Sequence, residues 1–158
     1  MIFTAHSAAG KDLGHMSFAV VNGLIFGLIS ALAGFFFVTE PHGEGWEFLW
    51  ITTGIGGFIA GFLIPRALIV KRDNYTNSRL VTCGFLIGIL SHWIHWYVSL
   101  VANYVNVELF GAYMLGEPTN PLAALPASAQ LSFMSLVFFG WTASLHSSRI
   151  FFQLLYIC

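Results

Sequence analysis

Charged residues are absent from long stretches of this sequence, and this absence limits the folds that the chain can adopt. No charged residue occurs between Asp12 and Glu40, and the whole chain is 57% hydrophobic and only 8% charged. A soluble domain carries roughly 25% charged residues, and a domain of this size still needs a wetted surface. We therefore expect an all-α integral membrane protein, in which lipid replaces water around the outer face.

The charged residues divide the chain into four apolar stretches, each close to the ~20 residues that cross the hydrocarbon of a bilayer. We predict one membrane domain over residues 1–158, built as a four-transmembrane-helix bundle. The predicted spans are residues 16–38, 46–70, 80–103 and 130–147. Residues 104–129 contain three prolines, which oppose one continuous helix, and we expect this outer segment to lie on the bundle or on a neighbour.

The basic residues favour one orientation in the membrane. The loop between the second and third predicted helices contains Lys71, Arg72 and Arg79, whereas the other two loops contain no lysine or arginine. By the positive-inside rule this basic loop is cytoplasmic. Four spans then place the N-terminus and the C-terminus in the cytoplasm as well, so we predict a multi-pass protein of a bacterial-type inner membrane.

Three of the predicted helices carry small residues at helical spacing. The pattern in the first helix recurs at one constant offset in the third, and the second has a stripe of its own. These residues are Gly23, Gly27, Ser30 and Gly34; Gly84, Gly88 and Ser91; and Gly54, Gly57 and Gly61. Small residues let helix backbones approach closely in lipid, so ordinary bundle packing explains the stripes. A second interpretation is the duplication of a two-helix hairpin.

Two histidines lie within the third predicted helix, which is unusual for a membrane span. His92 and His95 are three residues apart, follow Ser91, and could share a ligand or a proton on neighbouring faces of the helix. Ionisable residues inside a span are costly and usually face the bundle interior. They therefore suggest a pore or proton pathway, whereas the alternative is structural packing, with His95 bonded across a helix pair to Ser30 or Asn22.

The sequence does not predict a metal site, a cofactor or a catalytic residue. Two histidines supply only half of a tetrahedral metal site. The remaining ligands would have to come from the outer turn with Glu40, His42 and Glu44, which is more simply a solvated acidic loop. The net charge of −1 excludes nucleic acid as a partner.

Three functions agree with these features. The first is a membrane anchor, sensor or protective (defence) subunit, not an enzyme, whose partners are the lipid bilayer and further copies or other membrane subunits. The second is an oligomeric channel or permease with His92, His95 and Ser91 in its pathway. The third is a membrane redox or metal-binding subunit. Because no charged residue lies at the centre of any predicted span, ion-coupled secondary transport is disfavoured.

Overall fold

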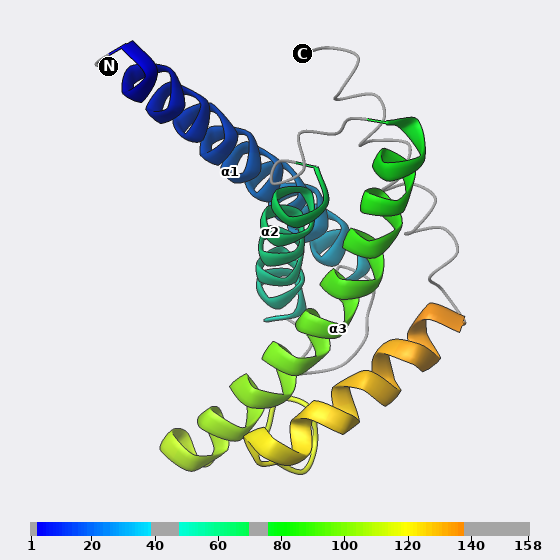
Figure 1. Cartoon of the computed structure of the whole chain (residues 1–158). Helices are drawn as coiled ribbons and strands as arrows, with labels where there is room; N and C mark the ends of the chain where they lie inside the picture. Colours follow the sequence, from blue (N-terminus) through cyan, green and yellow to red (C-terminus); the bar gives the residue numbers. More distant parts are fainter. Residues whose placement is uncertain (1–2, 39–47, 70–75, 138–158) are drawn as a thin grey trace.

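The computed structural model describes residues 3–38, 48–69 and 76–137, and nearly all of them are helical (Figure 1). The three long helices are α1 (Phe3–Val38), α2 (Leu49–Leu68) and α3 (Asn77–Phe110), and a shorter helix, Pro121–Val137, follows α3. The prediction of an all-helical chain is thus confirmed. By length and composition, α1, α2 and α3 are long and apolar enough to cross a membrane.

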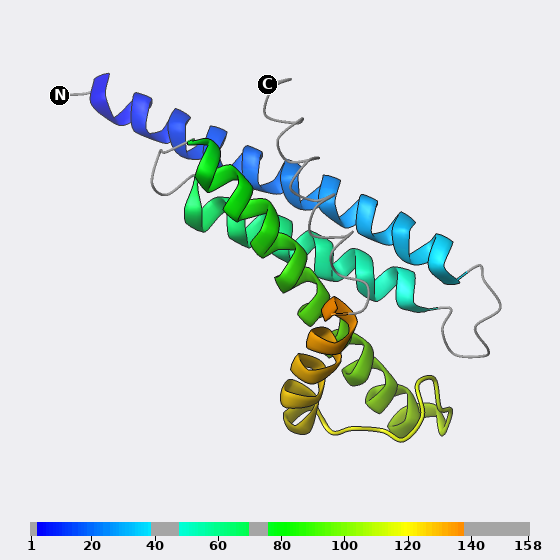
Figure 2. The same ribbon diagram turned by 90° about the vertical axis from the view of Figure 1, so that its right-hand side faces the viewer.

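α1 and α2 lie side by side and antiparallel (Figure 2). At 1.5 Å per residue, the 36 residues of α1 extend about 54 Å and the 20 residues of α2 about 30 Å. The N-terminal part of α1 therefore protrudes beyond the end of α2. Within α1, the apolar stretch of spanning length is Ser17–Phe36, close to the predicted span 16–38.

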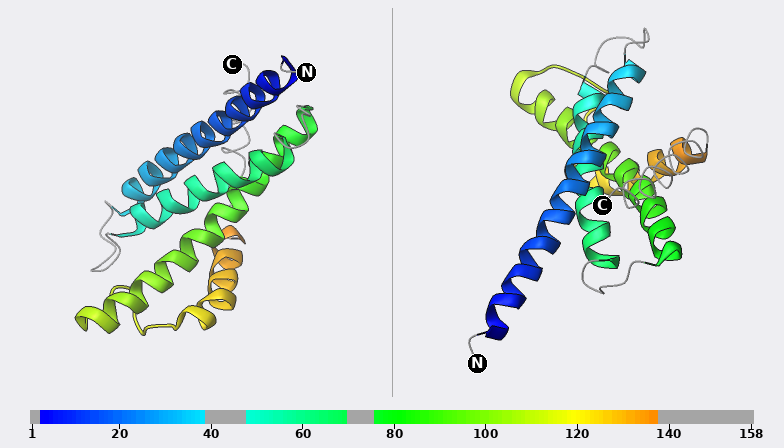
Figure 3. Two further views of the ribbon diagram at one scale, coloured as in Figure 1. Left: turned by 60° about the vertical axis from the view of Figure 1, so that its left-hand side comes forward. Right: turned by 90° about the horizontal axis from the view of Figure 1, so that it is seen from above.

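α2 occupies the middle of a row, with α1 on one side and α3 on the other (Figure 3). The helix Pro121–Val137 lies on the far side of α3. Where the long helices meet, a small apolar core forms from side chains of all three and of the residue that follows α2. Its buried members are Phe26, Ala60, Ile69, Leu80, Cys83 and Ile87.

The structure differs from the predicted outer segment 104–129 at both of its ends. α3 does not stop at Asn103 but continues to Phe110, where Gly111 adopts φ 67° and closes the helix with a hydrogen bond from its N–H to Val107 O. Glycine reaches this left-handed conformation without steric cost, which is why it commonly terminates helices. The true turn between the helices is therefore residues 111–120.

The next helix begins at Pro121, well before the predicted start of the fourth span at Gln130. Asn120 caps this helix, because its Oδ1 accepts a hydrogen bond of 2.9 Å from Ala123 N. Pro121 fits the first helical position, where no N–H is needed, and the helix continues past Pro126. The described part of this helix is shorter than a span, and residues 138–147 of the predicted fourth span lie outside the described residues.

Candidate functional site

A group of polar side chains is buried between α2 and α3. His95 of α3 contacts α2 through its ring nitrogen Nδ1, which lies 3.0 Å from Thr52 Oγ1 and 3.2 Å from Thr53 Oγ1. Ser99, one helical turn further along α3, lies with its Oγ 2.8 Å from Thr52 Oγ1. His95, Thr52 and Ser99 are all buried. We call these four residues the His95 cluster.

The helices approach closely enough for this cluster because residue 56 is glycine. A Cβ atom on Gly56 would lie only 2.5 Å from Ser91 O and 3.0 Å from the backbone nitrogen of His95. Real Cβ atoms do not tolerate the shorter contact, so any larger residue would push α3 away from α2. Gly56 thus sets the distance over which the threonines reach His95.

The hydroxyl hydrogens of the two threonines decide which tautomer of His95 fits the cluster. Each threonine hydroxyl has one hydrogen, and each oxygen lies within hydrogen-bond distance of both Leu49 O and Nδ1. If both hydroxyls donate to Leu49 O, both oxygens accept from Nδ1, which then carries the ring proton; a hydroxyl that donates to Nδ1 requires the proton on Nε2. We predict the first arrangement, in which Nε2 is the unprotonated nitrogen of the neutral ring.

This tautomer can be measured. In protein labelled with ¹⁵N at histidine, we expect the His95 signals of a protonated Nδ1 and an unprotonated Nε2. The double variant Thr52→Val and Thr53→Val removes both acceptors from Nδ1, and we expect the ring to lose this preference. A parent spectrum with the proton on Nε2 would contradict the assigned network.

His92 makes a separate contact on a neighbouring face of α3. Its Nε2 lies 2.6 Å from Ser135 Oγ of the helix Pro121–Val137, and Trp96 Nε1 donates a hydrogen bond of 3.2 Å to the same oxygen. Ser135 is also bonded within its own helix, to Leu131 O at 2.8 Å. This oxygen therefore fastens the Pro121–Val137 helix to α3.

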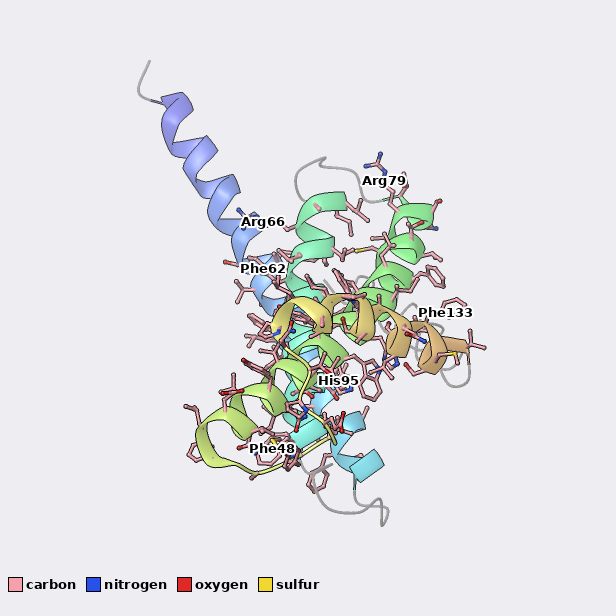
Figure 4. The ribbon with its side chains drawn as sticks, turned by 90° about the horizontal axis from the view of Figure 1, so that it is seen from below. Phe48, Phe62, Arg66, Arg79, His95 and Phe133 are labelled. Carbon is pink, nitrogen blue, oxygen red and sulfur yellow. The ribbon has the colours of Figure 1, made fainter. Side chains whose placement is uncertain are left out.

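The two histidines are close but face different neighbours. Their ring centroids are 6.2 Å apart, with His95 bonded towards α2 and His92 towards the Pro121–Val137 helix (Figure 4 labels His95). The predicted partners of His95, Ser30 and Asn22, are wrong. Asn22 instead donates to Phe18 O within α1, because the row places α2 between α1 and α3.

The predicted small residues of α1 and α2 lie at the contact between these two helices. A Cβ on Gly27 would be 3.2 Å from Gly54 O, and a Cβ on Gly57 would be 2.6 Å from Phe26 O and would collide with Ser30 Oγ. Gly23, Gly34 and Gly61 are similarly close to the opposite helix. On α3, Gly84 and Gly88 are buried, and Ser91 Oγ donates to Gly88 O.

Of the other predicted residues, only Arg79 is among the described residues. Arg79 is in the first turn of α3, and its Nη1 lies 3.4 Å from Leu68 O at the end of α2. Lys71 and Arg72 of the basic loop, and Glu40, His42 and Glu44 of the outer turn, lie outside the described residues. Among the residues that are described, no group of three or more metal-ligating side chains occurs.

Several residues of this site had no distinct signal in the sequence. Thr52, Thr53 and Ser99 are single polar residues inside apolar stretches, and Gly56 falls between the members of the predicted glycine stripe. Their common feature is that a buried hydroxyl in a span needs a partner. That requirement points to such residues, but it does not say which ones meet.

No known protein family, curated protein sequence or solved structure matches this chain. The fold and the site define a class of protein: an all-helical chain with three helices of spanning length, held together by small residues and buried polar side chains. The function has to be inferred from the chain's own residues and their contacts.

Proposed function

We propose that the chain is a multi-pass protein of the inner membrane that acts by assembly, as an anchor, sensor or protective subunit of a homo- or hetero-oligomer. The three helices of spanning length support its place in the bilayer. Arg66 and Arg79 lie at one end of the row, at the end of α2 and the start of α3. By the positive-inside rule this end, with both termini, is cytoplasmic.

The observation that carries the assembly proposal is how few residues of each candidate span are buried in the described part of the chain. Only 28%, 33% and 28% of the residues in the three apolar windows are buried. A row of helices leaves more of its outer surface open than a closed bundle does, although the Pro121–Val137 helix covers part of α3. In a membrane, lipid or further protein must cover this surface, and a row extends readily by adding helices.

The contacts of the histidines also favour a structural subunit. His95 and His92 each hold a neighbouring helix, and within the described residues every buried side-chain polar atom has a hydrogen-bond partner. Hydrogen bonds between helices of this kind are worth roughly 1 kcal/mol each in lipid. The polar residues of α3 therefore stabilise the arrangement of helices.

Disulfide crosslinking between copies in native membranes tests the proposal. In a background of Cys83→Ala and Cys158→Ala, one cysteine is placed at Leu28 or at Phe85, which are exposed on α1 and α3. We expect crosslinked oligomers, or a specific heterologous adduct, from at least one of these sites. Cysteine at Ala60, which is fully buried, is the matched control and should not crosslink.

Native mass spectrometry of gently extracted protein completes this test. A monomer that lacks any protein partner, together with no crosslink at Leu28 or Phe85, would contradict assembly. The same spectrum would detect bound metal or a redox cofactor, which is the outcome expected for a membrane redox subunit.

A channel or permease is the alternative, and the His95 cluster favours it. Ser99, Thr52 and His95 form a continuous chain of polar atoms, with steps of 2.8 Å and 3.0 Å, inside a candidate span. Such a chain can pass a proton between neighbouring groups. Proton flux into liposomes distinguishes the two functions: a channel loses flux in His95→Ala and His92→Ala, whereas an assembly subunit has no such flux to lose.

A further inference from the structure

An apolar groove of about 400 Å³ opens between α2, α3 and the Pro121–Val137 helix. Side chains of all three helices form its walls, and Ser132 contributes the only hydroxyl among the described lining residues. The lining residues are Ile64; Leu86, Ile89, Leu90 and Trp93; and Ala129, Ser132, Phe133 and Leu136. The groove lies inside the apolar stretches of α2 and α3.

The length and the lining of the groove suit a hydrocarbon chain. Along α3 the groove extends from Leu86 to Trp93, which is about 10 Å. An extended hydrocarbon chain can lie along this length against the apolar walls.

A cationic side chain lies in line with this groove. Arg79, Leu86 and Trp93 are spaced by seven residues and so share one face of α3. Arg79 therefore lies about 10 Å from Leu86 towards the basic end of the row. Figure 4 shows Arg79 and Phe133 on one side of the molecule, whereas Arg66 and Phe62 lie beside α1. Arg66 instead covers the ring of Phe62, 5.6 Å from its centroid.

Arg79 retains capacity to bind an anion. A guanidinium has five N–H donors, and the hydrogen bond from Nη1 to Leu68 O is long, at 3.4 Å. Guanidinium groups bind phosphate oxygens in pairs, and basic pockets between membrane helices on the cytoplasmic side are suited to anionic headgroups. Positive charge at the end of an apolar groove matches a molecule with a phosphate at one end and a hydrocarbon chain behind it.

We propose that this groove is a lipid-binding site, which holds one acyl chain of an anionic phospholipid with the lipid phosphate at Arg79. The inference rests on the proposed membrane location, with the basic end at the cytoplasmic leaflet. The acyl chain covers the walls of the groove and thereby bridges α3 and the Pro121–Val137 helix. The bound lipid is then a structural component of the chain rather than a substrate.

Native mass spectrometry from nanodiscs that contain equal amounts of phosphatidylglycerol and phosphatidylcholine tests the site. Ala129 lines the groove and is exposed, so Ala129→Phe fills the groove without a need to repack the core. We expect retained phospholipid to fall roughly tenfold, which corresponds to about 1.4 kcal/mol of binding free energy. Ala123 is exposed on the same helix but does not line the groove, so Ala123→Phe is the matched control and should retain lipid.

Arg79→Gln tests the headgroup assignment separately. The groove remains, so we expect bound lipid with no preference for phosphatidylglycerol over phosphatidylcholine, whereas the parent protein prefers phosphatidylglycerol. Unchanged lipid retention in Ala129→Phe, or an unchanged preference in Arg79→Gln, would overturn the site. The groove is filled by protein rather than lipid if the parent protein retains no lipid and a cysteine in place of Phe133 crosslinks to residues 138–158 or to another protein.

These outcomes are distinguishable from failure of the proposed function. Release of the protein from membranes by alkaline carbonate would contradict the proposed membrane location, and the lipid site that depends on it. A protein that resists carbonate and forms oligomers, but retains no lipid, would contradict the lipid site alone.

Discussion

Replacement of Gly57 by leucine is expected to separate α1 from α2 and to lower the free energy of unfolding by about 3 kcal/mol or more. Gly57 is buried, and a Cβ atom there would lie 2.6 Å from Phe26 O and would collide with Ser30 Oγ. The backbone carbonyl of Phe26 is held by its helix and cannot move away alone. The whole of α1 must therefore shift, and the close packing between the two helices is lost.

Reversible unfolding in mixed detergent micelles, followed by circular dichroism, measures this loss. Gly57→Ala adds only the Cβ and should have a smaller effect of the same sign. Ala67 is exposed on α2, so Ala67→Leu adds the same bulk without a collision and should unfold like the parent. If Gly57→Leu instead unfolded like the parent and merely changed the oligomeric state, the contact at Gly57 would lie between copies rather than within one chain.

Replacement of Asn103 by alanine is expected to loosen the turn 111–120 and to lower the free energy of unfolding by roughly 3 kcal/mol. The Asn103 side chain is fully buried and forms three hydrogen bonds to this turn. Its Oδ1 accepts from Met114 N at 2.8 Å and from Leu115 N at 3.0 Å, and its Nδ2 donates to Gly116 O at 3.2 Å. Each backbone group that loses its partner in a buried place costs about 1–3 kcal/mol.

Hydrogen exchange at the amides of Met114 and Leu115 reports this effect directly, since both amides should exchange faster in Asn103→Ala. Asn106 provides the matched control. It makes a single hydrogen bond to the same turn, to Ala112 O at 2.7 Å, in an exposed position, so Asn106→Ala should change stability by less than about 1 kcal/mol. Unchanged exchange at Met114 and Leu115 would show that Asn103 does not hold the turn.

The helical class could be predicted from the sequence because apolar residues and the absence of charge add up along each stretch. The uncharged stretch between Asp12 and Glu40 is long enough to require a helix of spanning length, whatever its neighbours are. The same reasoning located most of α2 and α3. The third predicted span ends at Asn103, whereas α3 continues to Phe110 and is closed by the left-handed backbone of Gly111.

The prolines of residues 104–129 bear on where helices begin as well as where they end. Residues 104–129 do not form one continuous helix, and a new helix begins at Pro121, which occupies the first helical position behind the Asn120 cap. The cap was visible in the sequence as an asparagine before a proline. Asn103 could not be found in this way, because its role depends on a turn that folds back from residues 111–120.

The partners of the histidines could not be predicted from the sequence. Spacing along α3 places His92 and His95 on neighbouring faces, but it does not say which helix each face meets. The order of the helices in the row decides this. With α2 in the middle, His95 meets Thr52 and Thr53 rather than the small residues of α1.

The sequence by itself determined the helical class, the approximate positions of three long apolar helices and the small residues that let helices approach, because each depends on local composition or spacing. The tertiary structure alone decided the pairing of helices, the partners of His95, the role of Asn103 and the groove between α2, α3 and the Pro121–Val137 helix. Each of these depends on contacts between residues distant in the chain, and in an apolar sequence many pairings satisfy the same local pattern.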